Sequence, residues 1–187
     1  MWGMGRLSIA FALAVAASLC ACTDDPEPGP EVPANEYCDS VADWDPGHAA
    51  FEREVLELVN EQRAQGGKCG GDEEFSPSGA LIMNPALRCA ARKHTADMIA
   101  RDYFDFEDPD GQGFAERAEL AGYDAEPVGQ VIAAGPREPA QVVATWMSND
   151  GNCAVLMNPE QNELGVGYLP AEDSTYSHYW TQVFGYR

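Results

Sequence analysis

The stretch that decides the fold lies near the C-terminus, where residues 163–186 read ELGVGYLPAEDSTYSHYWTQVFGY. The runs Leu164–Leu169 and Tyr179–Phe184 are rich in branched and aromatic residues, which favour β-strands, and the segment between them is acidic and polar. Val128–Ala133, further upstream, reads as another strand. The strands therefore cluster late in the chain.

Helical patterns come before these strands. Asp45-Pro46 and Asn84-Pro85 each place a capping residue before a proline, which suits the first position of a helix. Apolar residues at helical spacing follow the two caps: Phe51, Val55, Leu58 and Val59 after the first, and Leu87, Ala91 and Met98, with His94 on the same face, after the second.

Two further helices are expected, a short one over Phe114–Ala121 and one that begins at Glu138-Pro139, whereas Asn149–Gly151 is expected to be a turn. Helices that come first and strands that cluster late predict an α+β protein, with a small antiparallel sheet flanked by helices in a layered sandwich.

The N-terminus has the layout of a signal peptide. Residues 1–22 read MWGMGRLSIAFALAVAASLCAC, with Arg6 before an apolar run and small residues after it. The run Leu7–Leu19 is shorter than the about 20 residues that a membrane-spanning helix needs. The end of this segment resembles the lipobox of bacterial lipoproteins, which makes Cys22 the expected lipid-attachment residue. Plain secretion and a retained anchor remain as alternatives.

The charge balance narrows the possible partners. The 187 residues include 31 acidic and 11 basic ones, a formal net charge of −20. This balance argues against binding nucleic acid and against electrostatic docking on an anionic membrane. Prolines and acids dominate the segment after Cys22, as in extended linkers. We therefore expect a signal peptide over 1–21, an acidic Pro-rich tether over 22–37 and one domain over 38–187.

Seven short motifs run through this domain in a fixed order: Ala91-x-x-His94-Thr95-x-Asp97-Met98, Tyr103-Phe104, Pro109-Asp110-Gly111, Ala121-Gly122-Tyr123, Trp146-Met147, Gly165-Val166-Gly167-Tyr168 and Tyr179–Gly185. Together they resemble the bacterial branch of the CAP superfamily, also called the SCP domain, which contains the cysteine-rich secretory proteins. The resemblance covers about residues 51–186 and implies an α-β-α sandwich, in agreement with the order of elements above.

The resemblance also points to a cleft. Family members line it with two His and two Glu, and some hold a divalent metal there. At the matching positions this sequence has Phe106, Gln130, Asn149 and Tyr179, and Asn152 stands where bacterial members often have a further His. None of these side chains titrates usefully near neutral pH, so we expect no metal, no cofactor and no catalytic set. Three hypotheses remain for the cleft: a repurposed binding site, a decayed and merely packed one, or cryptic catalysis.

Four cysteines remain after export and lipidation: Cys38, Cys69, Cys89 and Cys153. An even number in an exported protein suggests two disulfides, and the spacing lacks the paired ligands of a zinc site. Four cysteines allow three pairings. The family resemblance implies Cys69 with Cys153, which leaves Cys38 for Cys89.

The expected function is non-catalytic binding at the cell envelope. The ligand classes considered are a small apolar molecule, a lipid, a glycan and an envelope protein. A lipid on Cys22 would hold the protein at a membrane, facing the periplasm or on the outer membrane; otherwise it is secreted. The alternatives are a hydrolase or protease-like CAP enzyme and a purely structural envelope protein. His94, expected to be buried, is the one imidazole that could rebuild a site if it faced the cleft.

Overall fold

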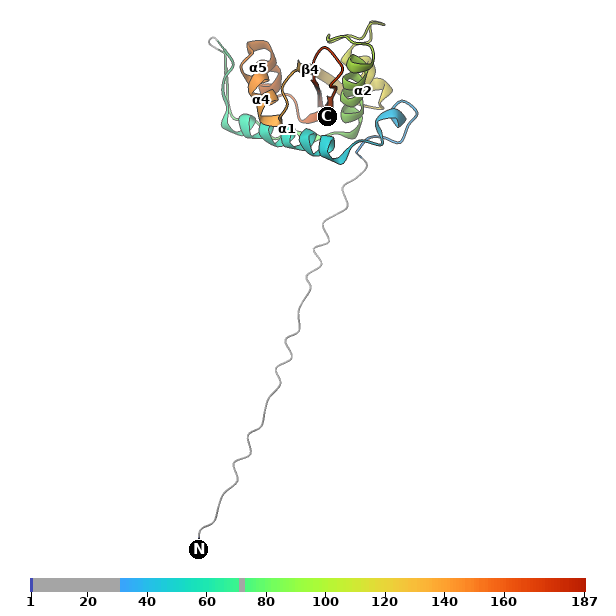
Figure 1. Cartoon of the computed structure of the whole chain (residues 1–187). Helices are drawn as coiled ribbons and strands as arrows, with labels where there is room; N and C mark the ends of the chain where they lie inside the picture. Colours follow the sequence, from blue (N-terminus) through green and yellow to red (C-terminus); the bar gives the residue numbers. More distant parts are fainter. Residues whose placement is uncertain (2–30, 71–72) are drawn as a thin grey trace.

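The structure is a computed structural model, and it describes residue 1, residues 31–70 and residues 73–187. The predicted signal peptide beyond residue 1, the lipidation motif at Cys22 and residues 22–30 of the predicted tether lie outside the described residues. The folded part forms one layered body (Figure 1).

Helices and strands follow the predicted order. They are the 3-10 helix η1 (Asp39–Val41), α1 (Pro46–Gln65), β1 (Gly67–Lys68), β2 (Glu74–Phe75), β3 (Ile82–Met83), α2 (Pro85–Ala100), α3 (Phe114–Leu120), β4 (Glu126–Ala134), α4 (Pro139–Met147), α5 (Asp150–Met157), β5 (Glu163–Pro170) and β6 (His178–Tyr186). The predicted caps form: the Asp45 carboxylate accepts from two backbone N–H groups of α1, and the Asn84 side chain does the same for α2.

The main sheet has four strands in the order β3-β5-β6-β4. β6 pairs antiparallel with both β5 and β4, and the two-residue strand β3 adds to β5 in parallel. The expected antiparallel sheet is therefore extended by one short parallel pair. β1 and β2 form a separate antiparallel pair that the sequence patterns did not indicate.

Helices cover both faces of this sheet, which gives the α-β-α sandwich (Figure 1). Val55 of α1, Trp146 of α4 and Leu156 of α5 share one core cluster with Trp180 of β6. On the other face, α2 and α3 pack through Leu87 and Ala118 against Val183. Successive side chains of each strand point to opposite faces of the sheet, so each strand contributes to both cores.

α2 lies directly on β5 because two glycines leave room for it. A Cβ atom on Gly165 would come 2.0 Å from the backbone carbon of Leu87, and one on Gly167 would come 2.6 Å from that of Ala91. Any larger residue at either position would force the helix off the sheet. The Gly-Val-Gly-Tyr motif is thus explained by close packing between helix and strand.

Asn149–Gly151 does not form the isolated turn that we expected. The Asn149 side chain accepts a hydrogen bond from the backbone N–H of Asn152, 3.0 Å away, and α5 starts at Asp150. Residues that favour turns also favour helix N-caps, because both roles use a side-chain oxygen to satisfy backbone donors.

Part of the predicted tether belongs to the fold. Val32 is buried against α2 and its neighbours, and the Asn35 amide donates to the carbonyl of Ala121, 3.1 Å away. Glu31 pairs with arginines of α1 and α2. The packed chain therefore includes residues 31–37, because an acid and an apolar residue within the Pro-rich segment find partners on the domain.

Two disulfides close the described chain, Cys38–Cys89 and Cys69–Cys153. This is the pairing that the family resemblance implies. The first ties the segment before η1 to α2, and the second ties the β1–β2 region to α5. In the chain-entropy model, loops this long contribute about 3–5 kcal/mol each when they are closed.

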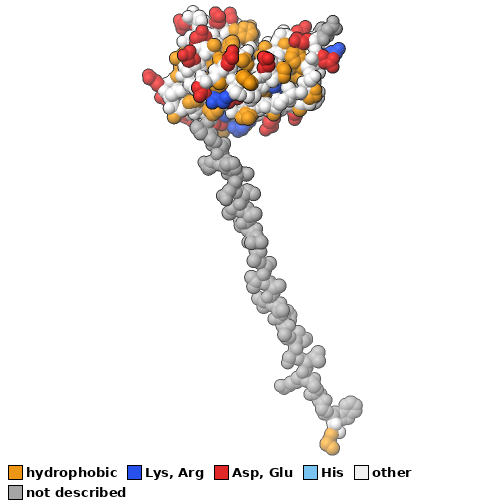
Figure 2. All heavy atoms as spheres, turned by 180° about the vertical axis from the view of Figure 1, so that it is seen from behind, with side chains coloured by type: hydrophobic (Ala, Val, Ile, Leu, Met, Phe, Trp, Pro, Cys, Tyr) orange, Lys and Arg blue, Asp and Glu red, His pale blue; other side chains and the backbone are white. Residues whose placement is uncertain are grey.

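Acidic side chains are spread over the back of the domain, with hydrophobic ones between them and few basic ones (Figure 2). None of the helices within residues 31–70 and 73–187 has the length and apolar character needed to cross a membrane.

Candidate functional site

Gln130 and Phe106 come together beside the buried side chain of Arg117. Gln130 lies on β4 opposite Val183, on the sheet face that α2 and α3 cover, and Phe106 lies between these two helices in the sequence. The Arg117 Nη2 group donates to the Phe106 carbonyl at 2.8 Å and to the Gln130 Oε1 atom at 2.9 Å. Gln130 Nε2 donates to the same carbonyl at 3.3 Å. We call these three residues and the neighbouring His94 the Arg117 cluster.

A hollow of about 330 Å³ opens next to Phe106 and Gln130. Phe114 at the start of α3 also lines it, and the remaining walls come from Glu107, Gly113, Ala115 and Glu116. The Phe106 ring is 49% exposed, whereas Gln130 is buried. This hollow, the Phe106 pocket, thus has two aromatic residues, one amide and two carboxylates in its wall.

His94 is buried within the domain. Its side chain is 1% exposed, and its Nε2 atom lies 2.9 Å from the carbonyl oxygen of Asp105. The Tyr103 hydroxyl lies 3.3 Å from its Nδ1 atom. Burial lowers the pKa of His94 from 6.5 to about 4, with a further lowering from the positive charge of Arg117. His94 is therefore a neutral packing residue at neutral pH, as its place on the apolar face of α2 predicted.

The remaining predicted cleft residues have other partners. Tyr179 is buried against Met98 and Ile132, and its hydroxyl lies 3.2 Å from the Ser174 Oγ atom. Asn149 caps α5 and bonds the backbone of Asn152. Asn149, Asn152 and Tyr179 do not line the Phe106 pocket. Of the five residues that we expected to share one concavity, Phe106 and Gln130 line the Phe106 pocket.

The residues at the family's cleft positions do not fit a metal ion. Zinc takes thiolate, imidazole and carboxylate ligands, and the positions hold a phenyl ring, amides and a phenol. Across residues 31–70 and 73–187, no group of three or more His, Cys, Asp or Glu side chains is placed to hold a metal. We derive no step through a metal here.

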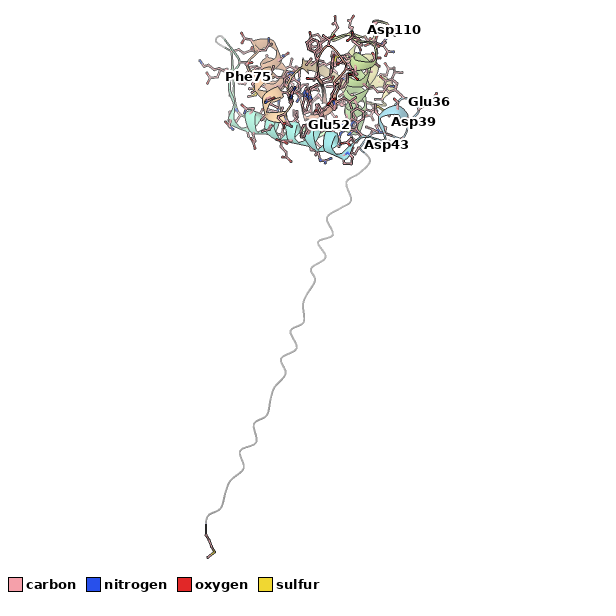
Figure 3. The ribbon with its side chains drawn as sticks, viewed as in Figure 1. Glu36, Asp39, Asp43, Glu52, Phe75 and Asp110 are labelled. Carbon is pink, nitrogen blue, oxygen red and sulfur yellow. A yellow bond between two sulfur atoms is a disulfide. The ribbon has the colours of Figure 1, made fainter. Side chains whose placement is uncertain are left out.

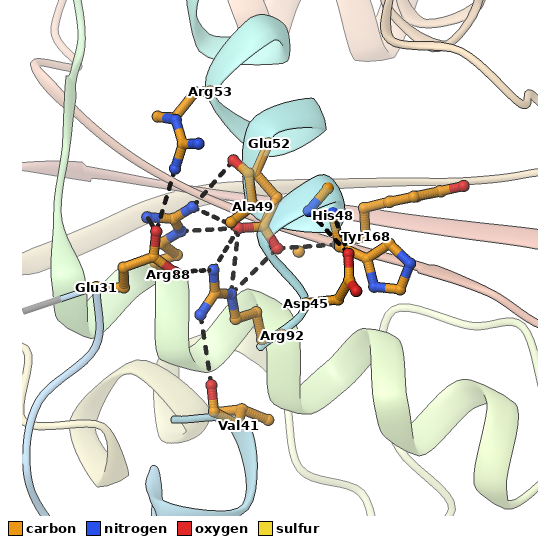
Figure 4. A network of polar contacts seen from close by, with 12 residues as sticks. Glu31, Val41, Asp45, His48, Ala49, Glu52, Arg53, Arg88, Arg92 and Tyr168 are labelled. Carbon is orange, nitrogen blue, oxygen red and sulfur yellow. Dashed lines mark hydrogen bonds and ion pairs between the residues drawn. The ribbon is translucent and has the colours of Figure 1, made fainter. Parts of the chain in front are cut away.

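A second buried polar cluster lies between α1 and α2 (Figure 4). Glu52 of α1 is fully buried and lies within the domain, whereas Glu36, Asp39 and Asp43 lie at its edge around η1 (Figure 3). The Glu52 carboxylate accepts from Arg88 Nε at 2.8 Å and from Arg92 Nη2 at 2.7 Å. It also accepts from the backbone N–H of Tyr168 at 3.3 Å.

Glu31 lies at the solvent-exposed edge of this cluster and pairs with three arginines. Its carboxylate lies 2.8 Å from Arg92 Nη2, 3.4 Å from Arg88 Nη1 and 3.1 Å from Arg53 Nη1. Burial would raise the pKa of Glu31, but the three guanidinium groups together hold it below its usual value. We call Glu52, Arg88, Arg92 and Glu31 the Glu52 cluster. Each of its buried charges has an opposite charge beside it.

Residues 56–184 match the sequence profile of "CAP: Cysteine-rich secretory protein family". The chain belongs to the CAP family. This match covers more than half of the chain and includes the Phe106 pocket and both faces of the sheet.

A bacterial protein of unknown role is similar over most of this chain. The uncharacterized protein YkwD of Bacillus subtilis (strain 168) is 29% identical over 136 residues, which are 73% of this chain and 47% of YkwD. This chain therefore spans about half the length of that relative.

Two solved structures share the fold. An extracellular protein containing an SCP domain from Bacillus anthracis superposes with a TM-score of 0.62 at 19% identity, covering 77% of this chain and 44% of that one. An outer surface protein from Borrelia burgdorferi gives 0.57 at 16% identity, covering 74% and 91%. Both bear out the CAP fold of this chain.

Sequence reasoning missed the buried charged residues. Arg117 lies three residues after Phe114 and four before Ala121, so helical periodicity places it on the apolar side of α3. Glu52 lies three and seven residues before Val55 and Val59, on the apolar face of α1. At both positions a charged residue occurs at helical spacing from apolar residues, and this spacing is the sequence signal that the charged residue is buried.

Proposed function

We propose that this CAP-family chain is an exported, lipid-anchored protein of the cell envelope that binds a small apolar ligand in the Phe106 pocket without catalysing a reaction. The observation that carries this proposal is the chemistry of that pocket. Phe106 and the amide of Gln130 stand where the family resemblance places ionisable residues, and Phe114 adds a second aromatic ring to the same wall.

Two polar groups near the pocket, the Gln130 amide and the His94 imidazole, are unsuited to acid–base work, and the carboxylates of Glu107 and Glu116 also line the pocket. An amide such as that of Gln130 does not exchange protons near neutral pH, and its oxygen already accepts from Arg117. The imidazole of His94 is neutral and buried. The exposed Phe106 ring, in contrast, offers apolar surface that a ligand would remove from water, which is favourable by about 25 cal/mol per Å².

Export and anchoring rest on the sequence before Glu31. The Leu19–Cys22 motif supports a lipid on Cys22, and the segment 22–30 would join it to the domain. The two similar structures are those of an extracellular protein and an outer surface protein, which supports export. A single acyl chain gives only weak membrane binding, but the several chains of a bacterial lipoprotein would hold the domain firmly.

The ligand proposal is tested with the neutral fluorescent probe N-phenyl-1-naphthylamine, which brightens in apolar surroundings. Wild-type protein should bind it saturably, and Phe106→Ala should weaken binding about tenfold, because part of the apolar wall is lost. Tyr186→Ala is the matched control, since that side chain is 54% exposed but lies outside the pocket. Equal binding by wild type and Phe106→Ala would overturn the assignment of this pocket.

The same protein decides the enzymatic alternative. Hydrolysis of casein or of p-nitrophenyl esters at a rate that Phe106→Ala abolishes would favour an enzyme. Anchoring is tested by detergent phase partition of the native protein and of Cys22→Ala. The native protein should enter the detergent phase and the variant the aqueous phase; a native protein found in the aqueous phase would rule out the anchor.

A further inference from the structure

Arg117 is a buried cation that the protein surrounds with neutral acceptors. Its side chain is 2% exposed, and its Nη atoms donate to the carbonyls of Gln112 and Phe106 and to the amide oxygen of Gln130. Among residues 31–70 and 73–187, no carboxylate forms an ion pair with it. Its Nε–H group, also buried, has no acceptor in this part of the chain. A buried charge without a counter-charge is costly.

Arg117 also lines a cavity that shares no lining residue with the Phe106 pocket. This cavity of about 370 Å³ lies against α2 and η1. Its polar lining comes from Lys93, Arg101, Arg117, Tyr37, Ser40, Gln112, Asp97 and Asp108, and the rest from Val41, Ala96 and Ala100. We call it the α2–η1 cavity. Its size is in the range of small-ligand sites.

The two carboxylates in this lining are already engaged. Asp97 accepts from Arg101 Nε at 2.8 Å and from the Tyr103 hydroxyl at 2.6 Å. Asp108 accepts from the backbone N–H groups of Asp110 and Gln112, both at 2.9 Å, and lies 3.3 Å from Arg101 Nη2. Arg101 pairs with both carboxylates, so the lining holds three cations, Lys93, Arg101 and Arg117, against two carboxylates.

Lys93 and Arg117 are left as the cations of the cavity without an acidic partner in the described chain. Lys93 Nζ donates to the Ser40 hydroxyl at 3.1 Å and lies 4.9 Å from the centre of the Tyr37 ring. In a chain with 31 acidic and 11 basic residues, two such cations facing one cavity are unexpected by charge balance alone.

We propose that the α2–η1 cavity binds a small organic oxyanion, the carboxylate or phosphate group of which becomes the counter-charge of Arg117. Lys93 would donate a charge-assisted hydrogen bond to the anion, and the buried Arg117 guanidinium would attract the anion through its charge. Charge-assisted hydrogen bonds are the stronger ones in proteins. The cavity is distinct from the Phe106 pocket, so this inference goes beyond the proposed function.

The first experiment follows the Arg117 Nε–Hε signal by proton–nitrogen NMR of the purified protein. Acetate and inorganic phosphate are titrated separately at constant ionic strength, with chloride as the comparison anion. Acetate or phosphate should shift this signal saturably and chloride should not, and the stronger of the two arms names the oxyanion chemistry. Equal small shifts with all three anions would overturn the proposal.

Variants then separate binding from folding. Gln130→Glu places a carboxylate within reach of Arg117, so an internal counter-charge should replace the external one and weaken anion binding about tenfold or more. Lys93→Gln should weaken it severalfold, and Lys68→Gln, an exposed lysine of β1, is the matched control. Circular dichroism confirms the fold of each variant. Unchanged anion affinity in a folded Gln130→Glu protein contradicts the proposal, whatever the outcome for the Phe106 pocket.

Discussion

The Glu52 cluster and the Arg117 cluster both bury arginine next to α2, and they satisfy its charge in different ways. Between α1 and α2, Arg88 and Arg92 share the carboxylate of Glu52, and Glu31 adds a second negative charge from outside. Between α2, α3 and β4, Arg117 has carbonyl and amide oxygens only.

This difference separates buried charges that stabilise the fold from one that could serve a ligand. A guanidinium that is paired with a buried carboxylate has its counter-charge and joins two helices, whereas a guanidinium that is held by neutral oxygens lacks a counter-charge. Gln130, which stands where the family resemblance places a Glu, gives Arg117 a neutral amide oxygen and no carboxylate. The following experiments break or sharpen this contrast.

The largest effect is expected from Glu52→Gln, which removes the shared carboxylate. It leaves Arg88 and Arg92 buried with only the partly exposed Glu31 as counter-charge, and should destabilise the protein by about 3–5 kcal/mol. Urea unfolding measures the free energy of unfolding. Glu54→Gln, at an exposed position of the same helix, is the control and should change it by less than about 0.5 kcal/mol. A loss below about 1 kcal/mol for Glu52→Gln would mean that the cluster is not a closed ion pair.

A second effect is the pH dependence that the Arg117 cluster imposes through His94. The pKa of His94 is about 4 in the folded protein and 6.5 unperturbed, so the unfolded chain takes up the proton first as the pH falls. The stabilisation is complete above pH 6.5 and is lost as the pH falls towards 4, by up to about 3 kcal/mol.

Unfolding curves measured between pH 7 and 4.5 check this expectation. His94→Gln should flatten the pH dependence over this range, while His178→Gln, which changes a half-buried imidazole, should keep most of it. Carboxylates with lowered pKa, such as Glu31 and Asp97, lose their contribution at lower pH and do not obscure this window. An equally steep curve for His94→Gln would show that the buried imidazole does not carry the effect.

The smallest effect is expected at the outer edge of the Glu52 cluster. Glu31→Gln keeps the size of the side chain and removes a partly exposed charge, so it should cost about 1 kcal/mol or less. The more sensitive measurement is limited proteolysis, in which the segment 31–37 should be cut faster once its ion pairs with Arg53 and Arg92 are lost. Glu36→Gln is the control, because its exposed side chain forms no ion pair in the described chain. Equal cutting of both variants would show that Glu31 does not hold the segment.

Local rules predicted the elements well. Asp45 and Asn84 cap their helices as expected, and the strands over 164–169 and 179–184 lie within β5 and β6, because capping and alternation depend on neighbouring residues. The helix α5 was missed because the same residues suit a turn and an N-cap, and only the chain beyond Asn152 decides between them.

The candidate site was less predictable. Motif resemblance brought Phe106 and Gln130 to one pocket, but it carried no information on Arg117, whose burial depends on three segments that meet only in the fold. The Glu52 cluster was missed for a related reason: a charged residue is usually solvated, so periodicity alone assigns it to the surface unless its partners are known. Long-range pairing of charges is the part that sequence patterns leave open.

The ion pairs of Glu31 also set a distance. With residues 31–37 packed on the domain, nine peptide steps would separate the proposed lipid on Cys22 from Glu31, instead of the sixteen to Cys38 that the predicted tether would allow. Fully extended, nine steps reach about 30 Å. A linker this short would keep the end of the domain with η1 and the start of α1 close to the lipid surface. The loop around Asp110, at the opposite end of α2, would then face away from the membrane (Figure 3).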